Sequence, residues 1–398
     1  MAPPSSSSAS PPPPSWVILG SIARVSAPPD GSDISLALTA PPRVSILTVS
    51  PRVFPEPATP KQFPFVLAAD PSGLLLLQAN LCCPETQETI RRRRNQSTFL
   101  KYFTSRYFVL DATASSAFQL PDPEPAYTIH HQALLGLAAA PSGDGHYMVA
   151  ELQPIIGSEK ATLLCFSSEV GKWFEKRVDY PVLPRPWAPI GVVSHHGRLW
   201  WIDLSWGVIN FDPFAKRPDL GLVQFPPGTV LECREGWGET DMYRSVGVSG
   251  GKLRFVDTYT RGGGTPKRSG RIRATRPPGC PRRFPCIVYF FLEKNLFGVD
   301  VRPKNPRIVY FFLEKNLFGV DVRTRRVVEC KVYGLVAPPS YYLATRFVRA
   351  WELPQPLPSG MNNWGKGINL AEKAKARPTQ PSPGDYSLVG MTMQTFIG

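Results

Sequence analysis

Short apolar segments separated by polar turns recur through residues 15–355. Residues 65–68 are apolar, the turn Asp70-Pro71-Ser72-Gly73 follows, and residues 74–77 form a second apolar run. Proline fixes φ and glycine accepts a positive φ, so a turn of this composition between two apolar runs predicts a β-hairpin. The pattern favours short strands over helices along most of the chain.

The clearest example covers residues 192–212, which predict three strands of an antiparallel meander. Its middle segment, Gly197-Arg198-Leu199-Trp200-Trp201-Ile202-Asp203, shares residue types with Gly251-Lys252-Leu253-Arg254-Phe255-Val256-Asp257. A shorter echo occurs in residues 317–321. Meanders that recur every ~40–55 residues match the blade spacing of a β-propeller. A β-sandwich also produces short alternating strands, and it stays open as the rival architecture.

We therefore expect an all-β fold, a β-propeller-like array of short antiparallel meanders with little helix. One helix is predicted, over residues 368–376 before Arg377-Pro378. Residues 1–14 are a Pro/Ser-rich leader with nothing apolar to bury, so we expect them to be disordered. Residues 261–286 are rich in Gly, Pro and Arg, and we expect an irregular insert there.

Residues 287–302 and 308–323 are identical, including the expected turn residues Glu293, Lys294 and Asn295. Packing cannot enforce identity at exposed turns, so the repeat indicates a recent duplication or a faulty gene model. Apolar, strand-like sequence follows the second copy directly, so we assign the second copy to the fold. We interpret the first copy as an insertion. We expect residues 288–292 to be poorly ordered or to form an exposed edge.

These observations divide the chain into five parts. They are the disordered leader 1–14, the first part of the β domain 15–260, the insert with the first duplicate 261–307, the last part of the β domain 308–355, and a weakly ordered tail 356–398.

Several motifs resemble a known family. The run from Gly197 to Phe214, the stretch from Tyr243 to Asp257 and residues 308–353 resemble the plant family with the domain of unknown function 1618, which is abundant in grasses. The opening strand at Trp16 resembles that family as well. The family is related in style to the propeller-like domains that follow F-boxes, so the resemblance implies this fold. It implies no reaction, and residues 261–286 depart from the family pattern.

The formal charge of +14 is concentrated in two runs, Arg91 to Arg94 and Arg261 to Arg283. Charge confined to short runs is weaker evidence for nucleic-acid binding than a stripe across a folded face. Arg91 to Arg94 fit either a nuclear localisation signal or a solvated loop. The cysteines are odd in number and have no Cys-x-x-Cys spacing, which argues against a disulfide framework or a zinc site. With no secretory signal or membrane span, we expect a cytoplasmic or nuclear protein.

Possible catalytic residues each have a structural interpretation that we favour. His195 and His196 lie near Ser194 and Asp203, but adjacent strand residues point to opposite faces, so we expect solvent-facing turn histidines. The pair His130 and His131 has the same problem, and His146 has no spaced partner. Four aspartates close apolar strands, and we expect them to cap turns; they are Asp203, Asp257, Asp300 and Asp321.

The tryptophans raise the question of a binding surface. Trp200, Trp201 and Trp206 fit a ligand platform, but we expect at least one of them in the core. Trp237 lies in the acidic, glycine-rich segment 232–241, which either contacts another protein or folds back on the sheet.

The sequence therefore predicts a non-enzymatic protein-interaction module whose partner is another protein. We assign no catalytic, cofactor-binding or metal-binding residue and no cofactor. A nucleic-acid binder that uses the arginine-rich runs is the alternative. A hydrolase on a β-propeller is the second alternative, since one sequence does not reveal groups that converge in space.

Overall fold

The computed structural model describes the chain in segments. They are residues 15–56, 58, 63–82, 103–181, 183, 185–225, 230–231, 244–249, 251–257, 270–272, 288–290, 308–313, 316–321, 326–332, 348–354 and 393–397.

The first sheet combines strands from residues 16–49 with a strand from residues 348–352. Its strands are β1 (Trp16–Gly20), β2 (Arg24–Val25), β3 (Ile34–Ala37), β4 (Val44–Val49) and β24 (Val348–Glu352). β1 lies between β24, to which it is antiparallel, and β4, to which it is parallel. β2 also runs parallel to β4, whereas β3 pairs with β4 in the antiparallel direction.

Three further sheets are four-stranded antiparallel meanders in which each strand pairs with the next in sequence. The second sheet contains β5 (Phe65–Ala69), β6 (Leu74–Cys82), β7 (Phe103–Asp111) and β8 (Ser116–Gln119). The third contains β9 (Gly136–Ala139), β10 (Tyr147–Pro154), β11 (Lys160–Ser167) and β12 (Lys172–Asp179), preceded by the 3₁₀ turn η1 (Gln132–Leu134). The fourth contains β13 (Gly191–His195), β14 (Arg198–Asp203), β15 (Gly207–Phe211) and β16 (Leu220–Gln224).

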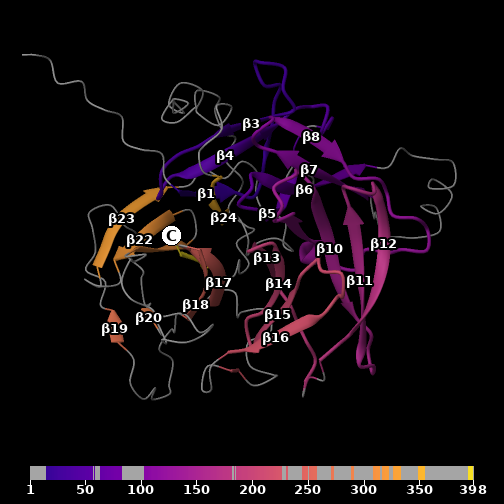
Figure 1. Ribbon diagram of the computed structural model, residues 1–398. Helices are drawn as coiled ribbons and strands as arrows, with labels where there is room; N and C mark the ends of the chain where they lie inside the picture. The colour runs from indigo at the N-terminus through magenta and orange to yellow at the C-terminus, as the bar shows by residue number, and fades with distance from the viewer. Residues whose placement is uncertain are drawn as a thin grey trace, which may run out of the picture.

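The remaining described strands form smaller pairings and one more four-stranded sheet. β17 (Arg244–Ser249) pairs with β18 (Lys252–Asp257), and β19 (Gly270–Ile272) pairs with β20 (Val288–Phe290). β21 (Ile308–Leu313), β22 (Asn316–Asp321), β23 (Arg326–Val332) and β25 (Met393–Ile397) form a sheet in the order β23-β22-β21-β25. Figure 1 shows the sheets following one another around the molecule, from β1 and β4 through β10–β12 and β13–β16 to β17, β18, β22 and β23.

The predicted hairpin repeat is confirmed by the burial of its shared leucine. Leu199, Leu253 and Leu317 occupy the second strands of three hairpins, β14, β18 and β22, and all three are buried. Gly197 and Gly251 precede the first two of these strands with φ of 68° and 67°. A side chain is strained at such φ values, so glycine is required at both turns.

Apolar clusters pack neighbouring sheets against one another. Val17 and Trp351 of the first sheet pack in one cluster with Leu75 and Leu77 of the second. A second cluster contains buried residues of the first, second and third sheets together with Tyr310 of β21 and Leu317 of β22. Two more clusters follow the same principle: one contains buried residues of the third and fourth sheets, and the other packs Val246 and Phe255 against the fourth. The hydrophobic core is therefore a series of inter-sheet layers.

The all-β class and the antiparallel meanders are confirmed. The parallel pairs of β1 and β2 with β4 depart from the expected pattern, because β24 occupies the antiparallel edge of β1. Among the described residues, η1 is the only helical segment, and the helix predicted over 368–376 lies outside them, as does the leader 1–14. The tail expected over 356–398 contributes the strand β25 to the sheet of the second duplicate.

Candidate functional site

Asp70 defines one end of three neighbouring sheets. Its Oδ2 accepts hydrogen bonds from Ser194 Oγ at 2.5 Å and from Ala139 N at 3.3 Å. Asp70 follows β5, Ala139 ends β9, and Ser194 is the penultimate residue of β13. The carboxyl ends of these three strands therefore meet at what we call the Asp70 end.

The opposite end of the third and fourth sheets follows from strand direction. β10 and β14 run antiparallel to β9 and β13, so the turns that follow them, residues 155–159 and 203–206, lie away from Asp70. The segments that lead into β9 and β13 lie there too. We call this the Asp203 end.

Both oxygens of the Asp70 carboxylate accept hydrogen bonds from backbone amides or from Ser194. Besides the bonds from Ser194 and Ala139, its Oδ1 accepts from Ser72 N at 2.9 Å and its carbonyl accepts from Gly73 N at 3.1 Å. The predicted turn at Asp70–Gly73 is thus confirmed. Both side chains are buried, Ser194 with an exposed fraction of 7% and Asp70 with 5%. A buried carboxylate requires such partners, so the arrangement is structural.

The adjacent histidines differ from the prediction. His195 is buried at the end of β13, whereas we expected both rings to face solvent. Burial, and secondly the nearby His196, lower the pKa of His195 to about 4. His196 has a φ of 51°, and the two ring centroids are 4.0 Å apart. The prediction failed for His195 because it is the last residue of a strand and not a turn residue, and because both faces of β13 are covered at this end, where the adjacent Ser194 and His195 are both buried.

At the other end, Asp203 organises the turn between β14 and β15. Its Oδ1 accepts from Ser205 N at 2.9 Å, its Oδ2 accepts from Ala188 N at 3.1 Å, and its carbonyl accepts from Trp206 N at 3.0 Å. The predicted turn-capping role is confirmed for Asp203. Asp257 and Asp321 also end strands, β18 and β22, whereas Asp300 lies outside the described residues.

Arg185 adds a cation beside this turn. Its guanidinium lies 3.9 Å from Asp203 Oδ1, donates from Nη1 to Leu231 O at 2.5 Å and also donates to Ser205 Oγ. The same group lies over the Trp206 ring at 5.9 Å, and Trp187 meets that ring edge-on at 6.1 Å. Cation–π and edge-to-face contacts of this kind stabilise the segment against the turn.

Three buried donor atoms of this region have no hydrogen-bond partner among the residues that the structure describes: Tyr180 Oη, Arg185 Nε and Trp187 Nε1. Burial, together with the negative charge of Asp203, raises the pKa of Tyr180. The phenol is therefore neutral and acts only as a hydrogen-bonding group. The cluster has a cation and polar donors, but Asp203 is its only carboxylate in these contacts, and its oxygens are occupied by backbone amides.

Glu151 plays the same structural role in the third sheet. It is 1% exposed, and its two oxygens accept from His130 N at 3.0 Å and His131 N at 2.5 Å. Gln153 Nε2 donates to it at 2.7 Å. The imidazoles of His130 and His131 are on exposed residues, so their backbone, not their rings, meets the carboxylate. His146 likewise donates its backbone N to Asp144 Oδ1, at 3.0 Å.

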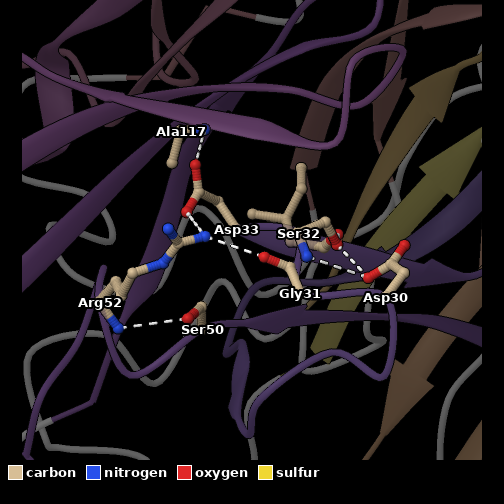
Figure 2. A network of polar contacts seen from close by, with 8 residues as sticks. Asp30, Gly31, Ser32, Asp33, Ser50, Arg52 and Ala117 are labelled. Carbon is tan, nitrogen blue, oxygen red and sulfur yellow. Dashed lines mark hydrogen bonds and ion pairs between the residues drawn. The ribbon is translucent and has the colours of Figure 1, made fainter.

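A polar network on the first sheet joins it to the second. Figure 2 shows Arg52 directed at Asp33, whose Oδ1 lies 2.8 Å from Nη2, and at the carbonyl of Gly31, at 2.9 Å. Asp33 Oδ2 in turn accepts from Ala117 N of β8 at 3.1 Å. The carboxylate is shared between an exposed cation and a strand amide, so this network also fastens two sheets together.

An apolar tip stands at the Asp203 end. Ile155 and Ile156 begin the turn between β10 and β11, and their exposed fractions are 36% and 102%. Gly157 follows with a φ of 75°, a conformation that glycine adopts without strain in a tight turn. At the Asp70 end of the same sheet, the turn between β11 and β12 carries Val170, which is 63% exposed. Turns are normally polar, so a β-branched pair at a tip is a candidate contact surface.

The predicted tryptophan burial is confirmed. Trp201 is fully buried and donates from Nε1 to Leu134 O at 3.0 Å, and Trp206 is 5% exposed. Trp200 is partly buried and donates to His195 O at 3.4 Å. Arg91 to Arg94 and Trp237 lie outside the described residues, and of the basic segment 261–286 only β19 is described.

The cysteines and acidic groups of the described part give no metal site. No group of three or more His, Cys, Asp or Glu in that part is placed to hold a metal ion. Burial raises the pKa of Cys165 to about 12, which keeps its sulfur as a thiol. In the same part of the chain, no helix has the length and apolar character that crossing a membrane requires.

Comparison with known proteins identifies one family. The family described as protein of unknown function (DUF1618) matches residues 201–281. The match supports the predicted resemblance to this family over residues 201–281. It begins in β14 and covers β15 to β19, so it includes the Asp203 turn and the hairpin of β17 and β18. It also reaches residue 281 and so extends into the segment 261–286, which we expected to depart from the family pattern. None of the curated proteins matches the chain.

Sequence reasoning missed several residues that the fold brings together. Glu151 and Arg185 gave no local signal, because their partners lie in segments whose approach depends on the packing of whole sheets. Ile155 and Ile156 did give one: two β-branched residues directly precede a Gly-Ser turn, where polar residues are the norm.

Proposed function

We propose that this chain is a non-enzymatic protein-interaction module built on a β-propeller-like array. The order of the sheets around the molecule supports the propeller interpretation, as do the apolar clusters between successive sheets. The pairing of β1 with β24 supports it further, because propellers close their ring by joining an early strand to a late one.

The observation that carries the interaction function is the exposure of Ile156. An aliphatic side chain held completely in water by a tight turn gains roughly 1.5–3 kcal/mol when a partner buries it. Lys160, the first residue of β11 after the turn, forms an ion pair with Asp179 at the end of the neighbouring strand β12, which gives the apolar tip a polar border. An apolar centre with a polar rim is the usual anatomy of a protein contact surface. The partner we propose is a protein with an apolar cleft.

The non-enzymatic part of the proposal is supported by the use of the buried carboxylates. Asp70, Glu151 and Asp203 each accept backbone amide hydrogen bonds, which is the role of a turn cap or a strand fastener. A catalytic acid or base instead requires a free oxygen directed at a substrate. We propose a cytoplasmic or nuclear setting for the module.

The test compares two turn variants of the third sheet. Ile155→Ser with Ile156→Ser removes the tip, and Val170→Ser removes an exposed apolar side chain at the Asp70 end. Proximity labelling and cross-linking in cells should show one partner set lost with the isoleucine variant and kept with the valine variant. Both variants should unfold at the wild-type urea concentration, since the mutated side chains are exposed. An identical partner set for all three proteins would refute the proposal.

A further inference from the structure

The outer strands of the three four-stranded meanders β5–β8, β9–β12 and β13–β16 differ in how their edges are protected. An exposed strand edge recruits other strands unless charge, proline or a covering segment blocks it. At β8, the Asp33 carboxylate accepts from Ala117 N at 3.1 Å (Figure 2), and the carbonyl of Ser115 accepts from Asp33 N at 3.1 Å. The outer strand β12 instead carries charge on five of its eight residues: Lys172, Glu175, Lys176, Arg177 and Asp179.

The outer strand of the fourth sheet, β16, has neither protection among the described residues. Its sequence, Leu220-Gly221-Leu222-Val223-Gln224, contains no charged residue and no proline. In the described part of the chain, β16 pairs with β15 alone, in one unshifted register over all five residues. The side chain of Leu222 has an exposed fraction of 36%, and Gln224 is exposed as well. This edge is therefore a template for one more strand.

The backbone of β16 directs alternate residues outward. Phe225 N donates to Trp206 O at 2.9 Å, which continues the ladder between β15 and β16. Backbone groups alternate in direction along an antiparallel ladder, so the amides and carbonyls of three residues point away from β15. These residues are Leu220, Leu222 and Gln224.

The strand is held in place on both faces. Leu220 is buried in the cluster of the third and fourth sheets, and Val223 packs in the cluster that contains Phe255. β16 is thus formed before another strand arrives, so binding orders little additional backbone.

We propose that β16 is an interface for a second copy of this chain, with the two β16 strands antiparallel about a twofold axis at Leu222. In that register Leu222 opposes its own counterpart, and Leu220 opposes Gln224 of the second copy. Directly opposed residues of this kind exchange two hydrogen bonds, so all the outward amides and carbonyls of β16 are paired. Each Leu222 also covers part of its exposed side chain with the other.

Two features favour a second copy over a strand from another protein. The outward residues 220, 222 and 224 are spaced symmetrically about position 222, so the edge is complementary to itself. The paired strands also bring no like charges face to face, because the charged residues nearest in sequence before β16 lie outside the paired positions. They are Lys216, Arg217 and Asp219.

The interface predicts weak, concentration-dependent dimerisation. A five-residue edge buries much less area than a stable dimer needs, so we expect a dissociation constant on the order of 100 μM. Sedimentation of the full chain from about tenfold below to about tenfold above that concentration should show monomer converting to dimer. Leu222→Lys places two like charges opposite each other and removes the leucine contact, so it should weaken the dimer about tenfold.

Mixing two charge variants tests the register. Leu222→Lys and Leu222→Glu should each dimerise poorly alone, but an equimolar mixture should dimerise as the wild type does, because position 222 faces itself. Phe118→Lys on β8 is the matched control. Phe118 is an apolar residue of an outer strand and is 53% exposed, yet Asp33 covers that edge, so the dimer should be unchanged. Urea midpoints near the wild-type value show that each variant folds.

A wild-type chain that stays monomeric over the whole range overturns the proposal, and the edge would then be open only to a strand of another protein. Dimers that Leu222→Lys leaves intact, that the mixture fails to restore, or that Phe118→Lys disrupts overturn it as well. The Ile155→Ser, Ile156→Ser protein should dimerise as the wild type does. The dimer interface is therefore tested separately from the partner surface proposed at the Asp203 end.

Discussion

The indole of Trp351 donates a hydrogen bond of 2.9 Å from Nε1 to the carbonyl oxygen of Asp70, across a separation of 281 residues. Asp70 in turn accepts from Ser194 and Ala139, so residues of the first, third and fourth sheets meet one turn of the second. Two residues that the sequence shows only as a turn aspartate and a strand tryptophan thereby connect four sheets.

Asp70→Asn is expected to destabilise the fold by about 1–3 kcal/mol, because an amide nitrogen in place of Oδ2 cannot accept from Ser194 and Ala139. Urea unfolding measures the change. Asp30→Asn is the matched control, since Asp30 also caps a turn through Ser32 but is exposed. Equal midpoints for the two variants would show that the contacts of Asp70 do not stabilise the sheets.

Gly136→Ala is expected to destabilise the fold by about 1–3 kcal/mol through overpacking. A Cβ at this position would lie 2.7 Å from Val192 Cγ1 and 2.8 Å from Leu199 Cδ2, where β9 approaches the fourth sheet. Gly247→Ala in β17 is the control, because a Cβ there meets no atom of the described residues within 4 Å. Thermal unfolding should separate the two variants. A Gly136→Ala protein as stable as Gly247→Ala would contradict the close approach of the third and fourth sheets.

His195 predicts a loss of stability in acid. Its folded pKa is about 4, below the ordinary value of 6.5, so the unfolded chain binds the proton more tightly. The stabilisation is fully present above pH 6.5 and is lost as pH falls toward 4, by at most about 3 kcal/mol.

Urea midpoints measured between pH 7 and pH 4 test this, with each variant compared with the wild type. His195→Gln removes the titrating group and should flatten the pH dependence in this window. His196→Asn, next to it in the chain, should leave most of the dependence in place. A wild-type slope retained by His195→Gln would mean that another group titrates.

The nucleic-acid alternative makes a prediction about salt. If the two arginine runs bind RNA, wild-type protein is retained on RNA at low salt and released as salt rises. Deletion of residues 261–286 combined with substitution of Arg91 to Arg94 by Gln should abolish that retention. The variant with only the four substitutions serves as the control for a single run. Retention that survives both changes would assign binding to another surface.

The sequence predicted the strands better than it predicted their neighbours. Glycines at turns and alternating apolar residues identify hairpins such as β13–β14 and β17–β18, because these signals are local. The burial of His195 and the approach of His130 and His131 to Glu151 were not predicted. Those contacts depend on which sheet lies against which, and neither residue spacing nor composition encodes it.

The position of β1 between β24 and β4 has a consequence for synthesis. β1 leaves the ribosome early, whereas its antiparallel partner, residues 348–352, emerges only after most of the chain has been made. Until then one edge of β1 has no partner from β24, and an unpaired edge recruits other strands. The first sheet of the molecule is therefore among the last to be completed. In a chain that stalls before residue 348, the β24 side of β1 can pair with strands of other nascent chains on the same polysome.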